Sequence, residues 1–183
     1  MSKPSLVIVL LEDDHHRMLI YRYLINCGLK THEIRLHPSP SGRGSAESWV
    51  RRRFAEETKE YRRRQTRARS ALIVIIDADT STVQERLNQL DQALKQSGNQ
   101  LVAEGEHIAR LVPKRNVETW ILCLHGKVVD EETDYSGTRN DWSKLIPEAS
   151  LTLCGWTRSQ AELPEHCVSS LRAGVRELKR VIS

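Results

Sequence analysis

The sequence lacks any apolar run long enough to cross a membrane, which takes about 18 residues. Its first apolar stretch, Leu6 to Leu11, is also too short for the core of a signal peptide, and acidic residues follow it at once. We therefore expect a cytoplasmic protein with no membrane partner.

Cysteine is scarce and shows no metal-binding pattern. None of the four cysteines belongs to a C-x-x-C pair, and none has a histidine at zinc-finger spacing. His166 does precede Cys167, but adjacent side chains rarely converge on one ion. Reduced thiols are the simpler interpretation in a cytoplasmic chain.

The motifs of several enzyme classes are missing too. No G-x-S-x-G and no cysteine–histidine arrangement supports a serine or cysteine nucleophile. The loop over 38–44 opens a long predicted helix, where backbone N–H groups can hold an anion. It is not a P-loop, because the G-x-x-x-x-G-K pattern is absent.

The sequence does contain two six-residue aliphatic runs, at 6–11 and 71–76, which are typical of strands buried on both faces. Strand and helix patterns alternate around them. This alternation predicts an α/β fold, a Rossmann-like and mostly parallel sheet with helices on both faces. The length of 183 residues suggests one domain, with a core over 1–126 and a C-terminal elaboration over 127–183 packed on it.

The element boundaries follow from hydrophobic periodicity and from end signals such as Gly98, together with a capping box at Ser81 and Gln84. We predict strands over 6–11, 31–37, 71–76 and 107–112, and helices over 14–26, 45–67, 81–97, 116–124, 141–146 and 168–182.

Acidic residues stand at the ends of the two aliphatic strands. Glu12 follows the first, and Asp77 and Asp79 follow the third strand of the chain. If these strands are neighbours, the three carboxylates meet at one edge of the sheet, where a cation relieves their repulsion. Oxygen ligands suit Mg²⁺ or Mn²⁺. Each acid can instead cap the next helix.

These residues resemble the Toprim domain of topoisomerases, primases and OLD-type nucleases over roughly 5–125. The resemblance implies that Glu12 acts in acid–base chemistry and that Asp77 and Asp79 hold Mg²⁺. One departure is Asp13, where many members have glycine. Asp13 or its neighbour Asp14 then becomes a possible substitute ligand.

A second segment, Pro113 to Trp120, resembles the P-x-x-x-x-E-x-W segment of the OLD group. It nominates Glu118 as an additional catalytic acid and Lys114 or Arg115 as a phosphate contact. Glu118 also lies near a predicted helix start, where the helix dipole stabilises an acid without any chemistry.

Basic residues concentrate in 43–69, which holds ten Lys/Arg against four glutamates. Two arginine triplets on the predicted helix lie about 16 Å apart on one face. Such a ridge fits the phosphates of a nucleic acid. Internal pairing with the glutamates is the alternative. The candidate phosphate contacts here are Arg43, Arg52, Arg53, Arg63 and Arg64.

Three functions from different classes fit these features. The first is a Mg²⁺-dependent nuclease acting on DNA or RNA, which the resemblance links to an ATPase partner and to antiviral defence. The second is a receiver domain, with Asp77 as phosphoacceptor and Lys114 at the phosphate. The third is a noncatalytic subunit that binds nucleic acid or an ATPase. His15 and His16 are candidate proton shuttles or phosphate contacts.

Overall fold

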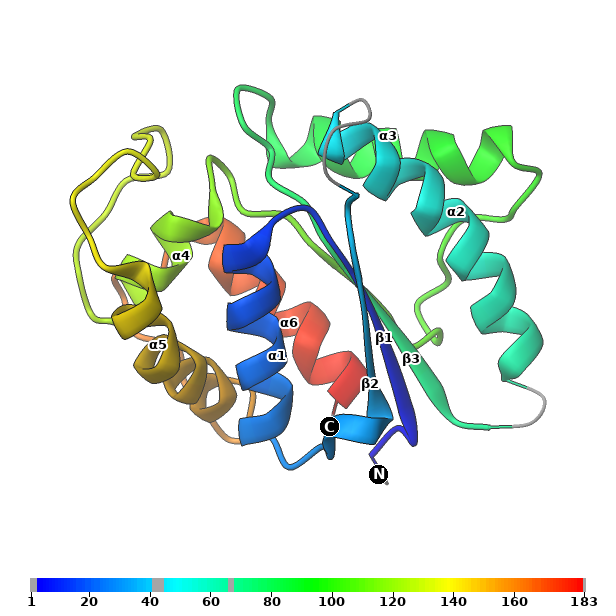
Figure 1. The fold of residues 1–183 in the computed structure, drawn as a ribbon, viewed down its shortest axis with the longest axis horizontal. Helices are drawn as coiled ribbons and strands as arrows, with labels where there is room; N and C mark the ends of the chain where they lie inside the picture. Colours follow the sequence, from blue (N-terminus) through cyan, green and yellow to red (C-terminus); the bar gives the residue numbers. More distant parts are fainter. Residues whose placement is uncertain (1–2, 41–44, 66–67, 183) are drawn as a thin grey trace.

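The computed structural model describes residues 3–40, 45–65 and 68–182. Within them, four strands form one fully parallel sheet in the order β2-β1-β3-β4 (Figure 1). The strands are β1 (Leu6–Leu11), β2 (Ile34–Pro38), β3 (Ser70–Ile75) and β4 (Ile108–Leu111). The predicted α/β class and parallel sheet are confirmed.

Helices cover both faces of this sheet. One face carries α1 (Asp14–Asn26), α4 (Val117–Leu124), α5 (Trp142–Trp156) and α6 (Ser169–Ile182). The other face carries α2 (Ala46–Arg64) and α3 (Val83–Gln96), and Figure 1 shows the two layers on opposite sides of the strands. A short 3-10 turn, Thr31–Glu33, leads into β2.

The two cores explain why the strand sequences are apolar throughout. Alternate residues of β1 point to opposite faces, so Val7 and Val9 join one core while Ile8 and Leu10 join the other. The first core also takes in residues of α5 and α6, so the C-terminal helices share it with β1 and β3.

A glycine allows a close contact between two helices of that core. A Cβ at Gly174 of α6 would come within 2.5 Å of the fully buried ring of Trp120 on α4. The Trp120 indole N–H donates to Ser170 Oγ at 2.7 Å. Trp120 is therefore a core residue that fixes α4 against α6.

Three local predictions are wrong. The strand predicted over 31–37 begins only at Ile34, because Thr31–Glu33 forms the 3-10 turn. The capping box of α3 is made by Thr82 and Glu85, one residue later than the predicted pair Ser81 and Gln84. The predicted short helix over 141–146 continues to Trp156 despite the internal proline, because a buried face of α5 packs on α1. No described helix is long and apolar enough to span a membrane.

The four cysteines are free thiols at two places in the fold. The Sγ atoms of Cys27 and Cys154 lie 2.6 Å apart, where the end of α1 meets α5. The side chains of Cys123 and Cys167 also interact with each other.

Candidate metal centre

The carboxyl ends of β1 and β3 form the centre of the candidate site. These two strands are direct neighbours, with Leu11 opposite Ile75 in the register. The connections leave to opposite faces here, because α1 covers one face and α2 and α3 cover the other. In open parallel sheets, ligands bind at such a switch point.

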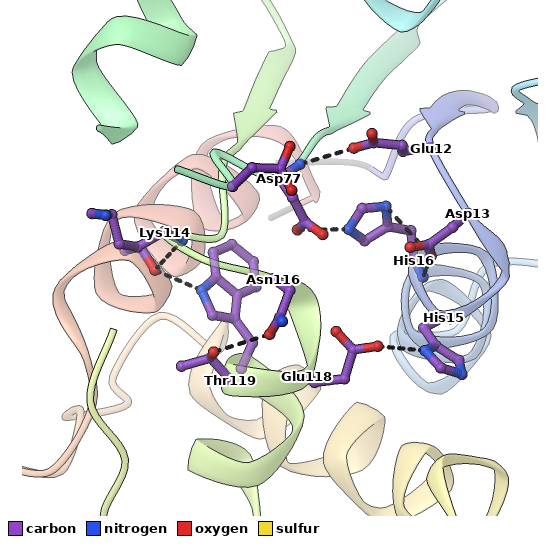
Figure 2. A network of polar contacts seen from close by, with 12 residues as sticks. Glu12, Asp13, His15, His16, Asp77, Lys114, Asn116, Glu118 and Thr119 are labelled. Atoms are coloured by element: carbon purple, nitrogen blue, oxygen red, sulfur yellow. Dashed lines mark hydrogen bonds and ion pairs between the residues drawn. The ribbon is translucent and has the colours of Figure 1, made fainter. Parts of the chain in front are cut away.

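Glu12 and Asp77 meet at this point. The Asp77 backbone N–H donates to Glu12 Oε2 at 3.2 Å, so the carboxylate of one strand end is tied to the backbone of the other. Figure 2 shows the Asp77 carboxylate pointing away from that bond, toward the ring of His16. The predicted convergence of Glu12 and Asp77 at one sheet edge is therefore present in the structure.

Asp13 and His16 complete the group from the first turn of α1. Asp13 is the N-cap and accepts the His16 backbone N–H at 2.9 Å. The His16 side chain is fully buried, with Nε2 3.0 Å from Asp77 Oδ1 and Nδ1 3.6 Å from Asp13 Oδ1. The helix cap therefore places an imidazole between two carboxylates.

Asp13, His16 and Asp77 form a group able to hold a metal ion, with one ligand atom from each lying within 4.8 Å of the others. His16 Nδ1 is buried and has no hydrogen-bond partner among the described residues. A buried nitrogen without a partner is unfavourable, and coordination to a cation would satisfy it. Two carboxylates and one imidazole are donors that Mn²⁺ accepts.

The charges of the group are strongly perturbed. Burial raises the pKa of Glu12 to about 7, against the opposing effect of His16. Burial likewise raises the pKa of Asp77 to about 6, again opposed by His16. For His16, burial favours the neutral ring, but the neighbouring Asp77 outweighs it and the pKa rises to about 9.

His16 and Asp77 therefore form an ion pair near pH 7, because this pH lies between their two pKa values. Glu12 remains partly protonated at the same pH. A divalent cation at this edge would favour the ionised form of both carboxyl groups. It would also displace the proton of His16, because an imidazole binds a metal only in its neutral form.

Asp79 is not one of the three grouped residues, although its charge contributes to the raised pKa of Glu12. Its backbone is left-handed, with φ of +54°, and its exposed carboxylate faces Arg86 at 3.3 Å. Arg86 is buried and also pairs with Glu47 of α2. Burial raises the pKa of Asp79, while Arg86 opposes the rise. Asp79 is thus held on the α2–α3 side of the strand end.

Glu118 lies next to the group in the first turn of α4. Its carboxylate is 2.6 Å from Nδ1 of His15, and its charge contributes to the raised pKa of Asp77. Figure 2 shows Glu118 and His15 facing each other beside the Asp13–His16–Asp77 group. The ring of His15 also lies against Trp142 of α5, with centroids 6.1 Å apart. Glu118, which the segment Pro113 to Trp120 nominated, therefore lies at the same edge of the sheet as Glu12.

The predicted phosphate contacts of the same segment pair with an acidic loop. Lys114 Nζ lies 3.2 Å from Glu132, and Arg115 lies 3.7 Å from Asp134. Both cations come directly before α4, on the side of the 130–134 loop.

The arginines of α2 are mostly paired on their own helix. Arg53 binds Glu56 and Glu57, and Arg64 binds Glu57 as well. Within the described residues, Arg52 is exposed and has no ion-pair partner. Arg63 pairs with Glu60, and the predicted contact Arg43 lies outside the described residues.

The sequence pointed to His16 as a proton shuttle or phosphate contact, and its place as a candidate metal ligand was missed. His16 stands three residues after Asp13, and at the start of a helix this spacing brings the cap and the imidazole onto one side. Recognising Asp13 as the N-cap of the helix would have predicted that His16 lies beside it.

The chain is thus a parallel α/β fold with an acidic and histidine group able to hold a metal ion. No family model matches the sequence, and comparison of the chain with curated proteins and with solved structures found no match.

Proposed function

We propose that the protein is a divalent-metal-dependent nuclease that hydrolyses phosphodiester bonds of nucleic acid. The observation that supports it most is the meeting of Glu12, Asp13 and Asp77 around a buried imidazole at the switch point of the sheet. The raised pKa values of Glu12 and Asp77 fit a site that functions with a cation.

Asp13, His16 and Asp77 are the residues that would hold Mn²⁺ or Mg²⁺. When bound, such an ion neutralises a phosphate and orients the attacking water. Glu12 stands at the edge of the group and acts as the general base that accepts the proton of that water. Glu118 holds His15 in place through their 2.6 Å contact, and His15 would then be the positioned phosphate contact or proton shuttle.

The basic surface of α2 supports a polyanionic substrate, because exposed Arg52 and partly exposed Arg53 face solvent. The resemblance to the OLD group extends the proposal to a subunit that works with an ATPase in defence against phage. Co-purification of the chain with an ATPase from its native host would test that extension.

A receiver domain is the second candidate, because the sheet order 2-1-3-4 also occurs in flavodoxin-like folds and fold alone does not decide function. Two contacts speak against it. The Asp77 carboxylate is buried against His16, whereas a phosphoacceptor must be accessible. Lys114, the expected phosphate contact, is paired with Glu132.

The test is cleavage of supercoiled plasmid and of labelled single strands in Mg²⁺, in Mn²⁺ and in chelator. We expect wild type to cleave only with metal and Asp77→Ala to lose activity by about a thousandfold or more, the scale of removing a central catalytic group. Asp79→Ala loses less, because that carboxylate lies on Arg86.

Asp14→Ala is the matched control, since Asp14 stands beside Asp13 but is exposed and paired with Arg17. It should cleave like wild type. Undiminished cleavage by Asp77→Ala would overturn the site. Absence of cleavage by wild type with nucleic-acid binding retained would instead indicate the noncatalytic subunit, and labelling of Asp77 by acetyl phosphate would indicate the receiver.

A further inference from the structure

A hollow of about 480 Å³ lies beside the edge strand β2, under the N-terminal half of α2. It is open to solvent and has a mixed basic and aromatic lining. The residues around it are His37, Pro38, Trp49, Arg52, Arg53 and Glu56.

The hollow begins next to the candidate metal centre. Pro38, at its floor, is the register partner of Leu11, and Glu12 follows Leu11 directly. The Ser39 backbone N–H donates to the Leu11 carbonyl at 3.0 Å, which keeps the end of β2 on that of β1. A chain lying in the hollow would therefore need to pass only one strand end to reach the acidic group.

Positive charge surrounds the floor of the hollow. Burial lowers the pKa of His37, opposed by Glu57, and Arg53, Arg35 and Arg64 lower it further. The positive charges of these three arginines therefore converge on the His37 side chain of β2. Glutamates neutralise part of this charge: Glu57 is shared between Arg53 and Arg64, and Glu56 pairs with Arg53, while Arg52 on the rim has no ion-pair partner among the described residues.

Trp49 adds a flat apolar surface to this charge. Its ring packs on the core beneath α2 but stays partly exposed, and it lines the hollow together with Arg52. Unpaired bases stack on such rings, while arginines on the rim hold the phosphates. In a duplex the base faces are covered by their neighbours, so a partly buried indole cannot reach them.

We propose that this hollow binds single-stranded nucleic acid, with a base stacked on Trp49 and the backbone on Arg52 and Arg53, and directs the strand to the acidic group. This inference rests on the proposed nuclease function and adds the strandedness of its substrate. An acidic peptide fits the arginines equally but gains nothing from the indole face.

The experiment measures binding apart from cleavage. Fluorescence anisotropy in chelator follows a labelled oligothymidine or oligouridine of about 15 nucleotides, near the upper end of known site sizes, and the corresponding duplex. The full chain is compared with Trp49→Ala, Trp49→Phe and Arg52→Ala over a salt series. Arg22→Ala is the matched control, because Arg22 is exposed on α1 across the sheet.

We expect single strands to bind at least about tenfold more tightly than duplex. Trp49→Ala should lower this affinity by about 5- to 100-fold, the range of base–aromatic stacking, and Trp49→Phe should restore most of it. Arg52→Ala should weaken binding and reduce the salt slope by about one, while Arg22→Ala changes neither. Circular dichroism confirms that each variant is folded.

Equal affinity for duplex, or wild-type affinity in folded Trp49→Ala, would overturn the inference. So would a polyglutamate peptide that binds as tightly and with the same dependence on Arg52. Metal-dependent cleavage that persists in either case leaves the nuclease function standing. Conversely, Trp49-dependent binding without any cleavage overturns the nuclease function and leaves the hollow as a binding site.

Discussion

The acidic group at the strand ends and the arginine-rich helix α2 carry charge in opposite ways. The arginines lie at the surface and share their charge with glutamates three or four positions away, as Arg53 does with Glu56 and Glu57. At the strand ends, Glu12 is partly buried and Asp77 is buried, and the cation that lies against Asp77 is the imidazole of His16. The helix pairs most of its arginines at the surface and leaves Arg52 without an ion-pair partner in the described part of the chain, whereas the buried carboxyl groups at the strand ends are poorly compensated.

The difference shows in the pKa values. Glu12 and Asp77 rise to about 7 and about 6, because burial outweighs what His16 can offset. Charges that pair with each other on the exposed surface of one helix have little effect on the free energy of unfolding. A buried acidic group that the fold leaves under-compensated is a candidate ligand site.

The largest expected effect comes from removing the one cation of the acidic group. His16→Ala leaves Asp77 buried without its partner, which costs about 3–5 kcal/mol of unfolding free energy. Urea unfolding near pH 7 in chelator measures this loss. His32→Ala is the control, because His32 is exposed in the turn before β2 and should change stability by less than about 0.5 kcal/mol.

Manganese then separates two roles of His16. A ligand present at about 100 times its Kd stabilises a protein by about 2.7 kcal/mol. If His16 Nδ1 binds the ion, Mn²⁺ stabilises His16→Ala less than it stabilises wild type. If His16 is only a counter-ion, the variant gains more than wild type, and that result would remove the imidazole from the ligand set.

The pH dependence of the metal-free protein is the next effect in size. Glu12 has a folded pKa raised from 4.5 to about 7, so its contribution to stability is complete below pH 4.5 and is lost as pH rises through 7. His16 follows the same sign from 6.5 to about 9. Stability in chelator should therefore fall steadily from pH 4.5 to pH 9.

Glu12→Gln isolates the first part of that fall. The variant should lose less stability than wild type between pH 4.5 and pH 7 and should parallel wild type between pH 7 and pH 9. Thermal unfolding across this range is the measurement. Identical slopes below pH 7 would show that Glu12 is not perturbed by the fold, and the contrast with α2 would then rest on Asp77 and His16 alone.

The sequence was sufficient to predict the central parallel strands of the sheet and the positions of two acidic residues, Glu12 and Asp77. The runs at 6–11 and 71–76 are apolar on both faces, which requires central parallel strands, and Glu12 and Asp77 stand at their ends whatever the details of the loops. The extent of α5 was not predictable, because its continuation past Pro147 depends on packing against α1.

The position of Asp79 depends on distant residues and could not be read from its spacing to Asp77. Its carboxylate lies on Arg86, seven residues later on α3, and Arg86 is held in turn by Glu47 from α2. The local sequence Ala78–Asp79–Thr80 does not indicate that the backbone of Asp79 is left-handed. Helical spacing predicted that the glutamates of α2 would pair with its arginines, but it did not predict which arginine each glutamate binds.

The smallest expected effect belongs to the arginine helix. Arg53→Gln removes two ion pairs, but the Arg53 side chain is 34% exposed and Glu57 keeps Arg64 at 3.3 Å. We expect a loss of about 0–1 kcal/mol in urea unfolding, together with weaker binding of single strands because Arg53 lines the hollow. A loss above about 2 kcal/mol would mean that buried Glu57 depends on Arg53, so that both regions hold costly charge. A small loss with impaired binding would instead show that a surface whose charges are already satisfied in the fold still serves the substrate.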